Sequence, residues 1–197
     1  INYALPFCLL AYTTLHVTAG FASIINSSAP LFTALAGWLW FKEKLTPPQI
    51  AGLLLGFGGV AILSWGKLSF RPDGGGLAVL AGLLATFLYG IAAHFTKRYL
   101  TGMSPLALTT WSLAGAAVFL AVPGFLMAPK ILPSARAWIA VTLLGLASTA
   151  LAFVLFFRLL NRWGTTRTIA VGFLIPVFGM LWGRIFLGEP VTLQMAL

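Results

Sequence analysis

The chain carries few side chains that could perform covalent chemistry. Its 197 residues include three acidic residues, two histidines and one cysteine. It contains no HExxH motif, no GxSxG motif and no Cys/His spacing typical of a metal site. The histidines, His16 and His94, fall on separate predicted helices, and no acidic residue lies inside a predicted membrane span. The sequence therefore predicts no catalytic residue, metal or cofactor, and it argues against an enzyme.

Polar side chains next to a proline are better placed for binding than for catalysis. Pro30 and Pro176 each lie about ten residues into an apolar stretch, where a proline removes one backbone hydrogen bond and kinks a helix. Asn26, Ser27 and Ser28 come about one turn before Pro30. These polar groups either satisfy the freed carbonyls or face a polar substrate, and the sequence leaves both open.

The elements that position these residues are predicted to be membrane-spanning helices. Hydrophobic residues make up 60% of the chain and charged residues 8%, whereas a soluble domain has about a quarter charged residues. Apolar stretches near ~20 residues recur, which is the helix length that crosses a ~30 Å hydrocarbon core. No alternating pattern suggests strands. The fold class is therefore an all-α polytopic membrane protein. The net charge of +9 does not indicate nucleic-acid binding, because the basic residues sit in short loops between apolar stretches.

The chain divides into seven predicted spans and the start of an eighth. Thr46 with Gln49 forms a predicted capping box, and Ser104 and Ser134 are predicted helix N-caps. A linker over residues 69–76 separates residues 1–68 from residues 77–197. The spans cover about 3–20, 21–41, 47–65, 77–96, 105–127, 136–157 and 168–187, and the eighth begins near Val191.

The two parts of the chain repeat each other at an offset of 146 residues, the spacing from Pro30 to Pro176. Ten identities share this offset, against roughly four expected by chance from such an apolar composition. The match of Glu43 with Glu189 weighs most, since acidic residues are so few. The identities are Ala4, Leu5, Phe7, Leu9, Pro30, Phe32, Leu35, Gly37, Glu43 and Thr46 with Ala150, Leu151, Phe153, Leu155, Pro176, Phe178, Leu181, Gly183, Glu189 and Thr192.

Loop charges predict that the two copies are inverted. Seven basic residues fall in loops on one side and four on the other. The richer side should be cytoplasmic, which predicts a multi-pass protein of the inner or plasma membrane with loops 42–44, 97–98 and 158–167 in the cytoplasm. Lys42-Glu43-Lys44 corresponds to Gly188-Glu189-Pro190, so equivalent loops differ in charge. The offset also leaves room for two helices before Ile1, giving an inverted-repeat bundle of five plus five helices when intact.

One segment of the first copy resembles a known family. The stretch from Ala19 to Leu35, which contains Asn26-Ser27-Ser28-Ala29-Pro30, followed by Glu43-Lys44-Leu45-Thr46, resembles the EamA domain of the drug/metabolite transporter superfamily. The second copy, Pro176 to Thr192, is similar but lacks the Asn-Ser-Ser. The resemblance implies a ten-helix secondary transporter with both termini cytoplasmic. Residues 1–68 would hold about three helices of the first EamA repeat, and residues 77–197 about four of the second plus the start of a fifth.

Several residues are candidates for the substrate cavity or its gates. Each also has a structural interpretation: Trp111 suits an interfacial anchor, Arg184 can snorkel towards headgroups, and a proton relay through His16 is less favoured than solvation. Glu43 and Glu189 could gate the cavity by pairing with basic loop residues, or simply shape their turns. The predicted substrate-binding residues are Tyr12, Asn26, Ser27, Pro30, Tyr89, Trp111, Pro176 and Arg184.

The sequence thus predicts a secondary transporter that moves a small metabolite, amino acid or drug-like compound by alternating access, with export favoured over import. Its partners would be membrane lipids and the small-molecule substrate, not nucleic acid, and monomer and dimer both stay open. The alternatives are an intramembrane lipid-modifying enzyme and a membrane protein without transport activity.

Overall fold

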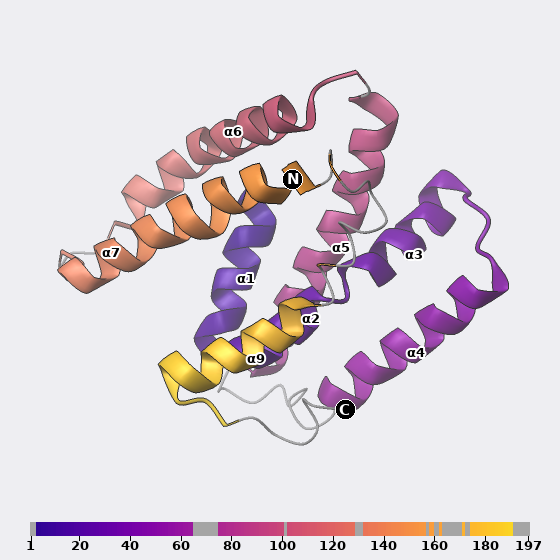
Figure 1. Ribbon diagram of the computed structural model, residues 1–197, viewed down its shortest axis with the longest axis horizontal. Helices are drawn as coiled ribbons and strands as arrows, with labels where there is room; N and C mark the ends of the chain where they lie inside the picture. The colour runs from indigo at the N-terminus through magenta and orange to yellow at the C-terminus, as the bar shows by residue number, and fades with distance from the viewer. Residues whose placement is uncertain are drawn as a thin grey trace. The chain divides into compact units, whose positions relative to one another are not determined.

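Helices form nearly all of the described chain. The computed structural model describes residues 3–64, 75–100, 102–128, 132–156, 158–159, 162, 171 and 174–190. Most of the predicted linker, the start of the eighth span and most of the loop 158–167 lie outside these residues. The helices, shown in Figure 1, are α1 (Ala4–His16), α2 (Ala19–Asn26), α3 (Ala29–Phe41), α4 (Pro47–Ser64), α5 (Gly75–Tyr99), α6 (Pro105–Leu126), α7 (Ala135–Leu143), the π-helix η1 (Leu144–Leu151) and α9 (Leu174–Leu187).

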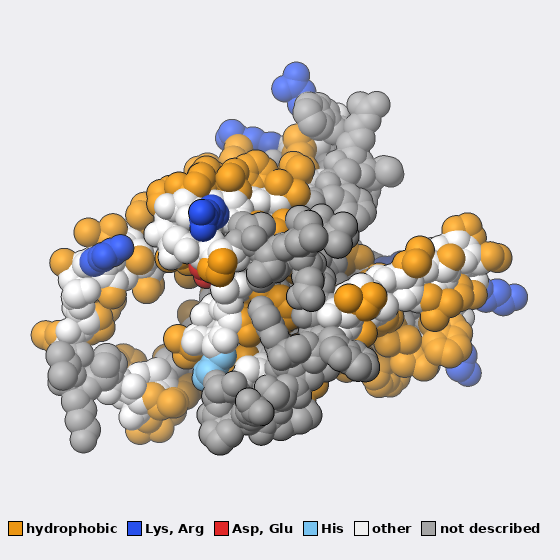
Figure 2. Space-filling view, turned by 90° about the horizontal axis from the view of Figure 1, so that it is seen from below, with side chains coloured by type: hydrophobic (Ala, Val, Ile, Leu, Met, Phe, Trp, Pro, Cys, Tyr) orange, Lys and Arg blue, Asp and Glu red, His pale blue; other side chains and the backbone are white. Residues whose placement is uncertain are grey.

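The helices have the length and surface expected of a membrane protein, which confirms the predicted fold class. Four helical segments are long and apolar enough to cross a membrane: Ala19–Trp40, Gly75–Tyr99, Pro105–Leu126 and Ala135–Phe156. Figure 2 shows hydrophobic side chains over much of the described surface, with scattered lysine and arginine side chains among them. Large apolar side chains such as Phe125, at 84% exposed, face outwards because lipid rather than water is the expected solvent.

The chain forms two compact units. The first comprises residues 1–101 and 172–197, and the second residues 102–171. In the first unit, α1, α2 and α3 all pack against α5 (Figure 1), and α2 also packs against α9. Its core consists of Phe21, Ile25 and Val79.

A buried hydroxyl ties α1 to α5. The Thr13 hydroxyl lies 2.9 Å from the carbonyl oxygens of both Leu9 and Ala78. A Cβ on Gly82 would lie 3.2 Å from the same hydroxyl oxygen, so a glycine at this position lets the two helices approach closely. This crossing holds α1 antiparallel to α5, as Figure 1 shows.

The second unit contains a change of helical pitch. Ser104 and Ser134 cap α6 and α7 by accepting hydrogen bonds from the backbone N–H groups of Ala107 and Ala137, as predicted. The predicted span 136–157 is not a uniform α-helix, because α7 continues as the π-helix η1. The Thr149 hydroxyl donates to the Leu144 carbonyl five residues earlier (3.1 Å), which helps to satisfy the wider turn.

One of the two hydrogen bonds of the predicted capping box forms at the start of α4. The Thr46 N–H donates to Gln49 Oε1 at 2.8 Å, which is the return arm of the motif. The Thr46 hydroxyl does not follow the usual pattern: it lies 3.0 Å from the same Gln49 oxygen. Gln49 therefore serves as acceptor for both Thr46 groups.

Candidate functional site

The helix of the second span is interrupted locally just before Pro30. Helix α2 ends at Asn26, α3 begins at Ala29, and Pro30 occupies the first turn of α3. A proline has no N–H group, so position 30 cannot donate the usual helical hydrogen bond to the Asn26 carbonyl four residues earlier. The interruption at Ser27 and Ser28 therefore falls in the turn before the proline, where a proline kink is expected.

Hydroxyl groups stabilise this break. The Ser27 hydroxyl donates to the Ile24 carbonyl at 2.7 Å, and the Ser28 hydroxyl donates to the Ile25 carbonyl at 2.6 Å. Ser28 is buried and also contacts the Thr86 hydroxyl of α5 at 3.3 Å. Because these protons are directed at backbone carbonyls, the hydroxyl oxygens can only accept further hydrogen bonds. This is the structural role that the sequence left open for the serines.

Asn26 differs from its neighbours at the break. Its side-chain oxygen Oδ1 is buried and has no hydrogen-bond partner among the residues that the structure describes. A buried amide oxygen without a partner costs about 1–3 kcal/mol, so native proteins seldom retain one without a reason. Asn26 Oδ1 is thus a buried acceptor for which the described residues supply no donor.

The remaining predicted cavity residues lie on helices α1, α5, α6 and α9. Tyr12 and His16 share a face of α1, with ring centroids 4.6 Å apart, and both side chains are exposed. Tyr89 is half-buried on α5, and Trp111 is 72% exposed on α6 of the second unit. On α9, Pro176 is the third residue of the helix and Arg184 is exposed near its end.

Glu43 follows helix α3 and Glu189 follows helix α9, and the two turns have the same hydrogen-bond pattern. The Glu43 N–H donates to the Gly37 carbonyl at 3.0 Å, and the Glu189 N–H donates to the Gly183 carbonyl at 3.1 Å. In both turns the residue before the glutamate has a positive φ, 54° at Lys42 and 66° at Gly188. Both are helix-ending turns in which a left-handed residue lets the chain reverse. The repeat seen in the sequence thus has a local structural counterpart.

Glu189 binds the beginning of α2. Its Oε1 accepts a hydrogen bond from the Ala19 N–H at 2.8 Å, and its Oε2 accepts one from the Gly20 N–H at 3.3 Å. These N–H groups have no partner within the helix, and the helix N-terminus favours a negative charge. The basic partner expected for Glu189 does not occur in the described part of the chain. This backbone contact links α9 to α2.

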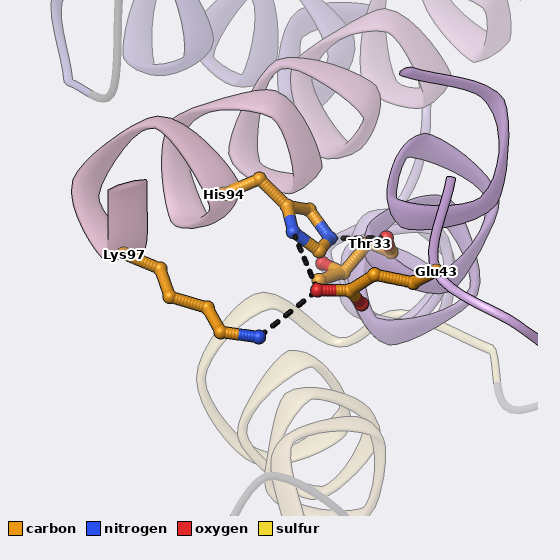
Figure 3. A network of polar contacts seen from close by, with 4 residues as sticks. All are labelled: Thr33, Glu43, His94 and Lys97. Atoms are coloured by element: carbon orange, nitrogen blue, oxygen red, sulfur yellow. Dashed lines mark hydrogen bonds and ion pairs between the residues drawn. The ribbon is translucent and has the colours of Figure 1, made fainter. Parts of the chain in front are cut away.

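Glu43 binds α5 instead, through the network of side chains in Figure 3. Its Oε1 accepts a hydrogen bond from the Lys97 ammonium at 2.9 Å and lies 3.7 Å from Nδ1 of His94. The other ring nitrogen of His94, Nε2, lies 2.9 Å from the Thr33 carbonyl of α3. Glu43 therefore pairs with a basic residue as predicted, and it also reaches a buried histidine.

Two glycines make room for the His94 ring. A Cβ on Gly37 would lie 2.9 Å from Cε1 and Nε2 of His94. A Cβ on Gly90, one turn before His94, would lie 2.8 Å from the Phe32 carbonyl. Helices α3 and α5 thus approach at backbone distance, which brings the Thr33 carbonyl within reach of His94.

Sequence reasoning missed His94 as a site residue. It is buried, at 7% exposed, whereas the histidine weighed for a proton relay, His16, is exposed and contacts its own helix carbonyl at Tyr12. The available signal was an ionisable residue within an apolar helix, which by itself suggests function. Its partner Glu43 is distant in sequence, so the pairing could not be read from spacing.

The ion pair with Lys97 predicts an acid-dependent loss of stability. The hydrogen bond from Lys97 is the main cause that holds the pKa of Glu43 below its usual value of 4.5, against a smaller opposing effect of desolvation. Since the pKa is lower in the folded state, the pair contributes stability above pH 4.5, and this contribution is lost as the pH falls through the lowered pKa. Glu43→Gln should reduce the decrease in Tm on acidification of the detergent-solubilised protein. Lys97→Gln should have the same effect, and an unchanged acid profile in both variants would contradict the assignment.

A separate cavity of about 700 Å³ lies beside η1 in the second unit. Its walls are mostly apolar, with two arginines, and none of the predicted cavity residues contributes to it. The lining residues are Ser148, Ala152, Phe153, Leu155, Phe156, Arg158, Leu159, Arg162 and Val171. Within the described ranges, no three His, Cys, Asp or Glu side chains gather as metal ligands would.

Comparison with known proteins places the chain among transporters. It is 28% identical to the uncharacterized transporter YvbV of Bacillus subtilis, over 99% of this chain and 64% of that protein. It is 28% identical to the "Probable terminal-alkyne amino-acid exporter" of Streptantibioticus cattleyicolor, over 92% of this chain and 60% of that protein. It is 26% identical to the "Probable amino-acid metabolite efflux pump" of Escherichia coli, over 97% of this chain and 66% of that protein.

The chain spans less than two thirds of the length of these relatives. No solved structure matches it. The profile of the EamA-like transporter family matches residues 1–65 and 76–197, which is nearly the whole chain. The chain therefore belongs to the EamA-like transporter family of membrane proteins.

Proposed function

We propose that the protein is a secondary transporter that exports a small amino compound by alternating access, and that the break between α2 and α3 is part of its substrate site. The observation that carries this proposal is the buried Asn26 Oδ1 without a partner in the described residues, at an interruption of a membrane helix. Substrate sites of secondary transporters lie at such interruptions, where backbone and side-chain groups are available to a solute.

The chemistry of the break supports a substrate that donates hydrogen bonds. Asn26 Oδ1 is an acceptor, and the Ser27 and Ser28 hydroxyls direct their protons at carbonyls. An amino acid or related metabolite brings an ammonium group that meets these requirements. The names of two relatives, a probable amino-acid exporter and a probable amino-acid metabolite efflux pump, support the same class of substrate.

The proposed orientation in the membrane follows from the loop charges, and the proposed transport cycle follows from the internal repeat. Loops 42–44, 97–98 and 158–167 would face the cytoplasm, and inverted copies would alternately open the site to either side. Glu43 and Glu189 would then lie near opposite faces of the membrane. Pro176 would mark the corresponding position of the second copy.

Counterflow in proteoliposomes tests this function. The full-length protein is reconstituted, loaded with one unlabelled amino acid at a time, and assayed for uptake of the same radiolabelled compound. The wild type should exchange at least one amino acid, and Asn26→Leu should raise its KM about tenfold or more, because the buried acceptor is lost. Thr14→Val, which removes an exposed hydroxyl of α1, is the matched control and should leave KM unchanged.

Two outcomes would contradict the proposal. A wild type that exchanges no compound in the panel, while folded by its melting curve, would argue against amino-acid transport. A folded Asn26→Leu variant with the wild-type KM would place the substrate elsewhere.

A further inference from the structure

The His94 ring lies between two hydrogen-bond acceptors, which determines what it can bind. Nε2 is 2.9 Å from the Thr33 carbonyl oxygen, an atom that only accepts, so Nε2 must carry a proton. Nδ1 faces the Glu43 carboxylate oxygen at 3.7 Å. A neutral ring would direct the Nδ1 lone pair at that carboxylate, whereas a ring protonated on both nitrogens would form an ion pair with it. The geometry therefore favours one additional proton at this position.

Lys97 keeps the carboxylate in its charged form. Its ammonium lies 2.9 Å from the same oxygen, Glu43 Oε1, that faces His94. The resulting decrease in the pKa of Glu43 means that the carboxylate stays ionised when a proton arrives. The proton is then held by His94 Nδ1. Glu43 is 44% exposed on its side chain and His94 only 8%, so the carboxylate provides the path from solvent to the buried ring.

The elements around His94 bring few other titratable groups. Helix α3 has none along Ala29–Phe41, and Lys97 lies on the same helix as His94. Helix α1 carries Cys8, Tyr12 and His16, and Tyr3 is its N-cap residue. It runs antiparallel to α5 (Figure 1), so that His16 lies towards the opposite end of α5 from His94 and Tyr3 towards the same end. Of the described charged groups, Glu43 lies next to the ring and Lys97 contacts Glu43.

The same contact acts on the helix that forms the proposed substrate site. Thr33 lies on α3, seven residues after Asn26, which is about 10 Å along a helix. Protonated His94 holds α3 through Thr33 and holds the loop after α3 through Glu43. Loss of the proton leaves Nδ1 facing a carboxylate and weakens the contact between α3 and α5 at this end. The orientation of α3, and with it the break at its beginning, then depends on the proton.

We propose that His94, paired with Glu43, is the proton-binding site through which a proton gradient drives transport. This inference rests on the proposed function. The proton binds at His94 Nδ1 from one side of the membrane and leaves towards the other after α3 and α5 have separated. No bond other than N–H forms or breaks, and one proton is exchanged per cycle. Neither the family match nor the relatives' names assign a role to either residue.

The test compares two kinds of transport in the same proteoliposomes. Counterflow at equal pH needs no proton movement, whereas accumulation driven by a pH gradient does. A carrier coupled to one proton accumulates substrate up to about tenfold per pH unit, since one unit corresponds to 1.36 kcal/mol. With the amino acid that the wild type exchanges in counterflow, His94→Gln should retain counterflow, because the glutamine amide can still donate to the Thr33 carbonyl, and it should lose gradient-driven accumulation because the amide binds no proton. The matched control is His16→Gln, which replaces the exposed histidine and should behave as wild type.

Each result assigns the failure to one of the two proposals. Absence of counterflow in the wild type would overturn the proposed function. Gradient-driven accumulation that persists in His94→Gln would overturn the proton site while leaving transport intact. If His94→Gln does not fold, NMR of protein labelled with ¹³C-histidine supplies a second measurement. The His94 signals are those that remain in His16→Gln, and their chemical shifts should change in Glu43→Gln, because the carboxylate next to Nδ1 is lost. Unchanged His94 chemical shifts would overturn the pairing.

Discussion

Replacing Gly90 by alanine is expected to lower the free energy of unfolding by about 2–3 kcal/mol, because the added methyl group would meet backbone atoms of α3. The added Cβ would lie 2.8 Å from the Phe32 carbonyl carbon and oxygen and 2.9 Å from the Thr33 nitrogen. These are backbone atoms within α3, so they cannot move aside as the end of a side chain could. Helix α3 must therefore shift away from α5. This shift also lengthens the hydrogen bond between His94 and the Thr33 carbonyl. The Tm of the detergent-solubilised protein measures the loss.

Gly52→Ala is the matched control for this prediction. Gly52 also lies within a helix, α4, but a Cβ there would meet nothing within 4 Å. Alanine is preferred over glycine within helices by about 0.5–1 kcal/mol, so Gly52→Ala should leave Tm unchanged or raise it. Equal Tm values for Gly90→Ala and Gly52→Ala would show that α3 and α5 do not pack at backbone distance.

The second large loss of stability is expected when Glu189 is replaced. Glu189→Ala removes the acceptors of two backbone N–H groups, those of Ala19 and Gly20. A charged cap at a helix N-terminus contributes up to about 2 kcal/mol, so the variant should lose stability of this order. Glu189→Gln keeps one carbonyl acceptor and should lose less. Thermal denaturation of the three proteins measures the series.

The equivalent residue of the first copy provides the comparison. Glu43 stands at the end of the same kind of turn, but its carboxylate contacts Lys97, whose side chain is 74% exposed. Pairs between exposed side chains contribute little, so Glu43→Ala should lower Tm less than Glu189→Ala does. The reverse order would mean that the contact of Glu189 with α2 is not a stabilising cap.

Much of the fold could be predicted from the sequence because its determinants are local. Apolar stretches of membrane-spanning length located the helices, and the hydroxyls of Ser104 and Ser134 located two of the helix starts. The identities of Gly37 with Gly183 and of Glu43 with Glu189 indicated matching turns, and the hydrogen bonds of the two turns agree. The boundary between the first two spans was predicted near residues 20–21, whereas α2 already begins at Ala19.

The parts that could not be predicted depend on contacts between distant residues. The sequence left open whether Ser27 and Ser28 bind the backbone or a substrate, and their hydroxyls bind carbonyls of α2. The pairing of His94 with Glu43 requires α3 and α5 to meet at Gly90, and no spacing along the chain shows that contact. The partner of Glu189 is backbone, which has no signature in residue types.

The direction of the hydroxyl protons at the break has a consequence for selectivity. Ser27 and Ser28 both donate to carbonyls, and Asn26 presents an oxygen, so in the proposed site the solute must supply the protons. Methylation of an amine leaves its positive charge in place while removing N–H groups one at a time. Binding should therefore weaken stepwise from a primary amine to its trimethylated form, although the electrostatic attraction hardly changes. The α2–α3 break would thus distinguish solutes by how many N–H groups they carry rather than by their charge.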